Sequence, residues 1–75
     1  MIHELDLVVL NHDMPDENLK MGDVGTVVHS YTDGKAFEVE FLTAKGKTVA
    51  LLTLNEKAIR PIYHREILHV RALAA

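Results

Sequence analysis

The sequence predicts a small all-β domain, and two observations support this. Short runs rich in valine, isoleucine and leucine recur along the 75 residues, and turn-forming residues separate them. One run, Ala36–Leu42 (AFEVEFL), alternates apolar and acidic residues, as a strand with one buried face does. A chain of this length has room for one core, so we expect a single domain over residues 1–75.

The first strand is expected at Leu5–Leu10 (LDLVVL), a short apolar run followed by turn residues. A polar loop follows over Asn11–Asp23, with room for a turn of helix at Asp16–Leu19. Val24–Tyr31 is the second predicted strand. Gly25 within it indicates a bulge or a close approach of another part of the chain.

Two hairpins are expected next. Thr32–Lys35 (TDGK) suits a type I′ turn, or a type I turn with a bulge, because glycine tolerates a positive φ. Ala36–Leu42 is the third strand, Thr43–Gly46 a second tight turn, and Lys47–Leu54 the fourth strand. Alternation places three apolar side chains of the third strand in the core, namely Phe37, Val39 and Phe41.

The end of the chain is less regular. Asn55 is suited to cap a single helical or 3₁₀ turn over Asn55–Ala58. Ile59–Ile62 reads as a brief closing strand, in which Pro61 indicates an edge or an end. Tyr63–Ala75 alternates in a way that favours a strand, with a short helix as the alternative.

These elements come in the order of an SH3-like barrel. Five short strands are joined by tight turns, one longer loop follows the first strand, and a helical turn precedes the last. We therefore expect a five-stranded SH3-like barrel with an additional C-terminal strand or short helix. Such a strand would pair with Leu5–Leu10 or extend to a neighbouring chain.

Charge is unevenly distributed along the sequence. Residues 1–42 hold nine acidic and two basic residues, a net charge of −7, whereas residues 43–75 hold two acidic and six basic residues, a net charge of +4. Complementary halves of one fold explain this, and so does a basic C-terminal surface that faces an acidic partner. The chain lacks the broadly basic character of a general nucleic-acid binder.

The residue pattern favours a protein that is not an enzyme and holds no metal or cofactor. There is no cysteine, so disulfides and thiolate zinc sites are excluded. His64 and His69 are five residues apart, which separates their rings on either a helix or a strand. Convergence of histidines in space is the alternative. Glu38 and Glu40 form a carboxylate pair on one strand face, interpreted as a solvated surface.

Protein contact is the leading functional hypothesis. The C-terminal segment carries more apolar residues than a five-stranded barrel needs, and arginines flank them. We therefore expect a protein-interaction surface there, for another protein or for a second copy. Its candidate residues are Tyr63, Arg65, Ile67, His69 and Arg71. No small-molecule substrate is evident, and a nucleic-acid partner is disfavoured by the few available aromatic and basic side chains.

A resemblance sharpens the prediction. Gly22–Val27 (GDVGTV) resembles the start of many SH3-like barrels, including KOW modules and the C-terminal barrel of the nitrile hydratase β subunit. The chain as a whole is more similar to a group of small bacterial proteins, domain-of-unknown-function family 4926. The matching segments are Glu4–Leu10, Gly22–His29, Asp33–Phe41, Leu51–Leu54 and Arg65–Arg71.

The resemblance implies an SH3-like barrel, assigns no catalytic residue and suggests, by fold analogy, an accessory or subunit-like role. The KOW likeness implies RNA binding as the alternative function. No apolar stretch approaches the roughly 18 residues that a membrane span needs, and the N-terminus is acidic where a signal peptide is basic. We expect a cytoplasmic protein.

Overall fold

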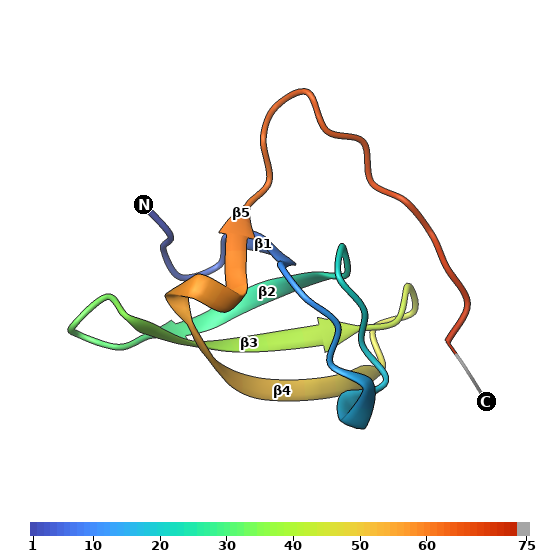
Figure 1. Ribbon diagram of the computed structural model, residues 1–75, viewed down its shortest axis with the longest axis horizontal. Helices are drawn as coiled ribbons and strands as arrows, with labels where there is room; N and C mark the ends of the chain where they lie inside the picture. Colours follow the sequence, from blue (N-terminus) through green and yellow to red (C-terminus); the bar gives the residue numbers. More distant parts are fainter. Residues whose placement is uncertain (74–75) are drawn as a thin grey trace.

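The chain forms one sheet of five antiparallel strands in the computed structural model, which describes residues 1–73 (Figure 1). The strands lie in the order β4-β3-β2-β1-β5. The predicted all-β class and the five strands are confirmed. The elements are β1 (Leu7–Leu10), η1 (Pro15–Glu17), β2 (Val24–Ser30), β3 (Ala36–Leu42), β4 (Thr48–Asn55), η2 (Glu56–Ala58) and β5 (Ile59–Pro61), where η marks a 3₁₀ turn.

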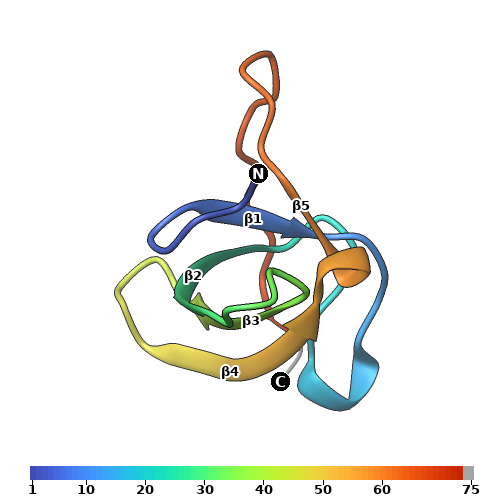
Figure 2. The ribbon, with the colours of Figure 1, turned by 90° about the vertical axis from the view of Figure 1, so that its left-hand side faces the viewer.

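The first strand lies inside the sheet because it is paired on both sides. Val8 is opposite Gly25 of β2 on one side and opposite Pro61 of β5 on the other. The sheet curves around the core when viewed along the strands (Figure 2). It does not close into the expected barrel, since no pairing joins β4 to β5 within residues 1–73. β5 is three residues long and ends at a proline, which leaves little backbone for a second partner.

The core lies on the concave side of this sheet. The apolar side chains of β3 point into it as predicted: Phe37, Val39 and Phe41 are all at most 3% exposed. Leu19, from the loop after β1, is also buried and holds that loop against the core. The complete buried cluster is Val8, Leu10, Leu19, Val27, Phe37, Val39, Phe41, Leu54 and Ile59.

The predicted turns form where their residues allow. In the first hairpin the Tyr31 carbonyl accepts from the N–H of Gly34 at 2.9 Å, and Gly34 has a φ of +69°. Asp33 is not among the residues with positive φ, so the type I form with glycine following it is the one adopted. The predicted cap before η2 is also present, since Asn55 Oδ1 accepts from the N–H of Lys57 at 2.8 Å.

The prediction of a strand or helix over residues 63–75 is wrong for the part that the structure describes. Residues 62–73, which we call the tail, contain neither, and residues 74–75 lie outside the described chain. The reason lies in the sheet. β5 already occupies the free side of β1, so the tail finds no strand there to pair with.

Gly25 is a close-approach glycine, one of the two predicted alternatives. A Cβ atom at this position would lie 2.6 Å from Val39 Cγ1 and 2.8 Å from Phe41 Cε2, both in the core. These separations are well inside van der Waals contact, and both neighbours are packed and unable to move freely. Only glycine lets β2 approach β3 this closely.

We expect Gly25→Ala to destabilise the fold by about 1–3 kcal/mol, the usual cost of overpacking a core. Urea denaturation followed by circular dichroism measures this loss. In the double variant Gly25→Ala/Val39→Ala the two losses should be less than additive, because the second change removes the methyl group that the new Cβ meets. Wild-type stability for Gly25→Ala would show that this approach is not a constraint.

Candidate functional site: the anchored tail

The tail is fixed at its beginning by an ion pair with β5. Arg60 donates from both terminal nitrogens to the two carboxylate oxygens of Glu66, each at 2.7 Å. The Tyr63 backbone N–H donates to the same carboxylate at 2.8 Å, and the Arg60 guanidinium lies 5.2 Å from the centre of the Tyr63 ring. Bidentate geometry makes this a well-defined contact rather than a loose surface pair.

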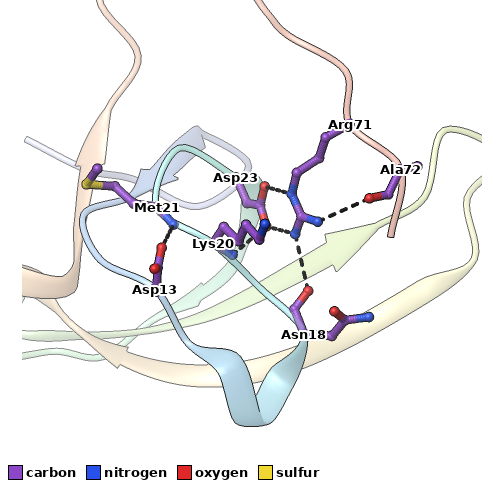
Figure 3. Close-up of polar contacts among 7 residues, drawn as sticks. All are labelled: Asp13, Asn18, Lys20, Met21, Asp23, Arg71 and Ala72. Atoms are coloured by element: carbon purple, nitrogen blue, oxygen red, sulfur yellow. Dashed lines mark hydrogen bonds and ion pairs between the residues drawn. The ribbon is translucent and has the colours of Figure 1, made fainter. Parts of the chain in front are cut away.

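A second ion pair fixes the tail near its end. Arg71 Nε donates to Asp23 Oδ1 at 2.8 Å, and a terminal nitrogen of Arg71 donates to Asp23 Oδ2 at 2.5 Å (Figure 3). The same terminal nitrogen donates to the carbonyl oxygen of Asn18 at 3.2 Å. Asp23 also accepts from the Lys20 N–H at 2.8 Å, which sets its orientation. Side chains 48 residues apart in sequence are thus joined.

Both acidic partners are held in the ionised state. The hydrogen bond from Arg71 lowers the pKa of Asp23 below its ordinary value, against a smaller opposing effect of burial. The hydrogen bonds from Arg60 and from the Tyr63 N–H lower the pKa of Glu66 to about 2. Correspondingly, Asp23 raises the pKa of Arg71 and Glu66 raises that of Arg60. Both pairs therefore persist at neutral pH.

Between the two anchors lie residues 67–70, which we call the apolar segment. Ile67 is 92% exposed, Val70 90% and Leu68 64%. Leu68 lies at a shallow groove that Leu7 and Ile62 also line. Isolated exposed apolar residues are ordinary, but three within four residues form a local patch that water solvates poorly.

The structure places the five predicted interaction residues in two different roles. Tyr63, Arg65, Ile67 and His69 are exposed along the tail. Arg71 is not presented to solvent as a free flanking charge, because its guanidinium contacts Asp23. The sequence pattern indicates Asp23 only as part of a turn and gives Glu66 no special role. The Tyr63-to-Glu66 spacing, in which a carboxylate meets the N–H three residues earlier, is the signal that was available for Glu66.

The carboxylate pair on β3 is a surface feature, as interpreted. Glu38 accepts from the Thr53 hydroxyl at 2.7 Å and from the Tyr31 hydroxyl at 2.8 Å, and these bonds, that of Thr53 first, lower its pKa. Glu40 accepts from the Thr48 hydroxyl at 2.8 Å. An ionised acceptor satisfied by hydroxyl groups is poorly suited to protonate a substrate. This arrangement stabilises the outer face of the β3–β4 hairpin.

The histidines do not gather around a common centre in the described chain. Residues 1–73 contain no group of three histidine, aspartate or glutamate side chains that could hold a metal ion. His29 Nδ1 lies 3.5 Å from Glu4, and the His29 ring meets the Tyr31 ring edge-on at 4.8 Å between centroids.

No helix in residues 1–73 has the length and apolarity to cross a membrane.

Comparison with known proteins identifies the family. The family model "Domain of unknown function (DUF4926)" matches residues 4–61, more than half of the chain, so the chain belongs to this family. The match ends at Pro61, which leaves the similarity proposed for residues 65–71 outside the matched part. No curated protein and no solved structure matches the chain.

Acid should release the first anchor. Glu66 has a folded-state pKa of about 2, below its ordinary value of 4.5, so its contribution to stability is complete above about 4.5 and is lost as the pH falls toward 2. A carboxyl-detected NMR titration should report this low pKa. In Arg60→Met the Glu66 pKa should rise toward 4.5, whereas Arg65→Met, which removes an arginine one residue from Glu66, should leave it low. A Glu66 pKa near 4.5 in the wild type would contradict the anchor.

Proposed function

We propose that this member of the DUF4926 family is a non-catalytic protein-interaction or accessory module that binds another protein, or a second copy of itself, through the apolar segment of its tail. One observation carries the proposal: Ile67 and Val70 are about nine-tenths exposed on a segment whose two ends are fixed by ion pairs. We place this role in the bacterial cytoplasm, in keeping with the cysteine-free sequence.

Energetics support a binding role for this segment. Burying an isoleucine or valine side chain contributes about 1.5–3 kcal/mol, so these two side chains supply part of the driving force for association. The ion pairs reduce the number of conformations that the segment samples before binding, which lowers the entropy cost of association. Arg65 is exposed beside this segment and His69 within it, and both are available to acidic groups on a partner.

We further propose that the curved sheet is an SH3-like fold that stops short of full closure. The pairing of β1 with both β2 and β5, and the 3₁₀ turn directly before β5, support this. SH3-like folds serve many functions, so the fold alone does not select one. The location of exposed apolar side chains on the tail is what favours protein contact.

The RNA-binding alternative has less support. A phosphate-binding surface needs lysine and arginine side chains that are free to contact the backbone. Just before β2, Asp23 forms an ion pair with Arg71, so this arginine is not free to contact phosphate. The adjoining loop contributes exposed acidic residues, namely Asp13, Asp16 and Glu17. Fluorescence anisotropy with an RNA pool at about 50 mM salt would reveal this activity if it were present.

Substitutions on the apolar segment should weaken association. We expect Ile67→Ser/Val70→Ser to raise the dissociation constant at least about tenfold, because two apolar contacts are lost. Sedimentation velocity over a range of concentrations measures self-association, and affinity capture from lysate followed by titration of the purified partner measures binding to another protein. The control Met21→Ser removes a side chain that is 66% exposed elsewhere and should leave association unchanged.

Two results would count against the proposal. One is a wild-type protein that stays monomeric at every concentration and binds no partner. The other is a loss of association with Met21→Ser that equals the loss with Ile67→Ser/Val70→Ser, because general surface hydrophobicity would then be the cause.

A further inference from the structure

β4 is an open edge of the sheet. It is the last strand in the order β4-β3-β2-β1-β5, and its eight residues pair only with β3. No backbone hydrogen bond joins β4 to any other element of residues 1–73. In an edge strand, every second residue directs its N–H and C=O away from the sheet, so β4 offers a row of unpaired groups.

The two edges of this sheet differ in how they are protected. β5 is short, contains Arg60 and ends at Pro61, three features that discourage a further strand. β4 has none of them, since its sequence TVALLTLN contains no proline and no charged residue. Its exposed Leu51, at 56%, adds an apolar contact on the outer face. A long and uncharged edge of this kind is suited to pair with a further strand.

The tail has the properties of such an incoming strand. It has no regular structure of its own, and residues 67–70 make no backbone hydrogen bond within the described chain. The apolar segment contains Ile67, Leu68 and Val70, residue types that fit a pleated surface. The Glu66 N–H donates to the Tyr63 carbonyl at 3.0 Å and closes a turn, so the part of the tail that is free to extend is residues 67–70. An extended chain spans about 3.3 Å per residue, so these four residues match half of the eight residues of β4.

The tail of the same molecule is held away from β4. In both ribbon views it leaves β5 on the side opposite β4 (Figures 1 and 2). The Arg60–Glu66 pair holds its beginning at β5, and the Arg71–Asp23 pair holds its end near the start of β2. A tail that pairs with β4 therefore comes from a second molecule.

Charge favours this pairing of copies. Next to β4 lie Glu38 and Glu40, which face Thr53 and Leu51 across the strands, and Glu56 follows β4 directly. The tail contributes the exposed Arg65, whereas its acidic residue Glu66 is already paired with Arg60. An arginine that approaches an acidic face gains attraction during encounter and in the complex.

We propose that residues 67–70 of one copy add as a further strand to the β4 edge of a second copy. The reverse contact, made at the same time by the second copy, closes a two-fold symmetric dimer, so both exposed β4 edges are covered. This inference rests on the proposed function, since it identifies the partner of the apolar segment and the site that the segment binds.

Cysteine cross-linking tests the geometry of this strand pairing. Because the chain has no cysteine of its own, only the introduced cysteines can form a disulfide. A chain with Leu51→Cys is mixed with chains that carry cysteine at position 67, 68 or 70, and disulfide-linked heterodimers are counted after mild oxidation. Since strand side chains alternate, positions 68 and 70 should behave alike and differ from 67. Equal yields at all three positions, or no cross-link at any, would overturn the proposal.

Charge placed on the edge tests the location. Leu51→Lys should raise the dimer dissociation constant at least about tenfold by removing an apolar contact and repelling Arg65 of the incoming tail. The control Val28→Lys introduces the same charge at an exposed position of the interior strand β2 and should have little effect. If Ile67→Ser/Val70→Ser weakens association while Leu51→Lys does not, the tail binds elsewhere. The proposed function then stands and this inference falls.

Discussion

The double pairing of β1 is the constraint on which the rest of the structure depends. β1 has four residues, and β2 and β5 occupy both of its sides. Its alternate side chains Val8 and Leu10 are among the most completely buried in the molecule. Because β5 takes the remaining side of β1, the residues that follow have no place beside β1, and β4 is left as the open end of the sheet. The tail and the open edge therefore have one common origin.

Electrostatic contacts hold the tail where apolar packing does not. The tail contributes no member of the buried cluster, and its most apolar side chains face solvent. The two ion pairs differ in exposure: the side chains of Asp23 and Arg71 are 18% and 26% exposed, and those of Glu66 and Arg60 are 36% and 32% exposed. The Asp23–Arg71 pair is thus less screened by water than the other, although neither is fully buried.

The strands were predictable because their signals are local. Alternation in residues 36–42, glycine after Asp33 and the Asn55 cap each act within a few residues, and each appears in the structure where the sequence indicates it. The structure of the tail was not predictable in this way. Its apolar pattern suits a strand, but whether a strand forms there depends on which neighbour is free, a property of the whole sheet.

In the candidate site too, features set by nearby residues were predictable, and features set by distant residues were not. Exposed apolar residues in the tail were predicted from their excess over what a small barrel needs. The partner of Arg71 was not, because Asp23 is 48 residues away and lies within a turn motif that already explains an aspartate. Barrel closure was expected although Pro61 already indicated an edge or an end, and the last strand, three residues that end in proline, is too short to pair with β4 as well.

The pairing of β1 with β5 also sets the order in which the molecule is completed. The chain grows from its N-terminus, so the residues of β1 are made first and those of their second partner about fifty residues later. Until then one side of β1 is unpaired, and the hairpins of β2, β3 and β4 are able to form before it is covered. During synthesis one side of β1 therefore stays unpaired until β5 has been made, and an unpaired strand side is open to incorrect pairing.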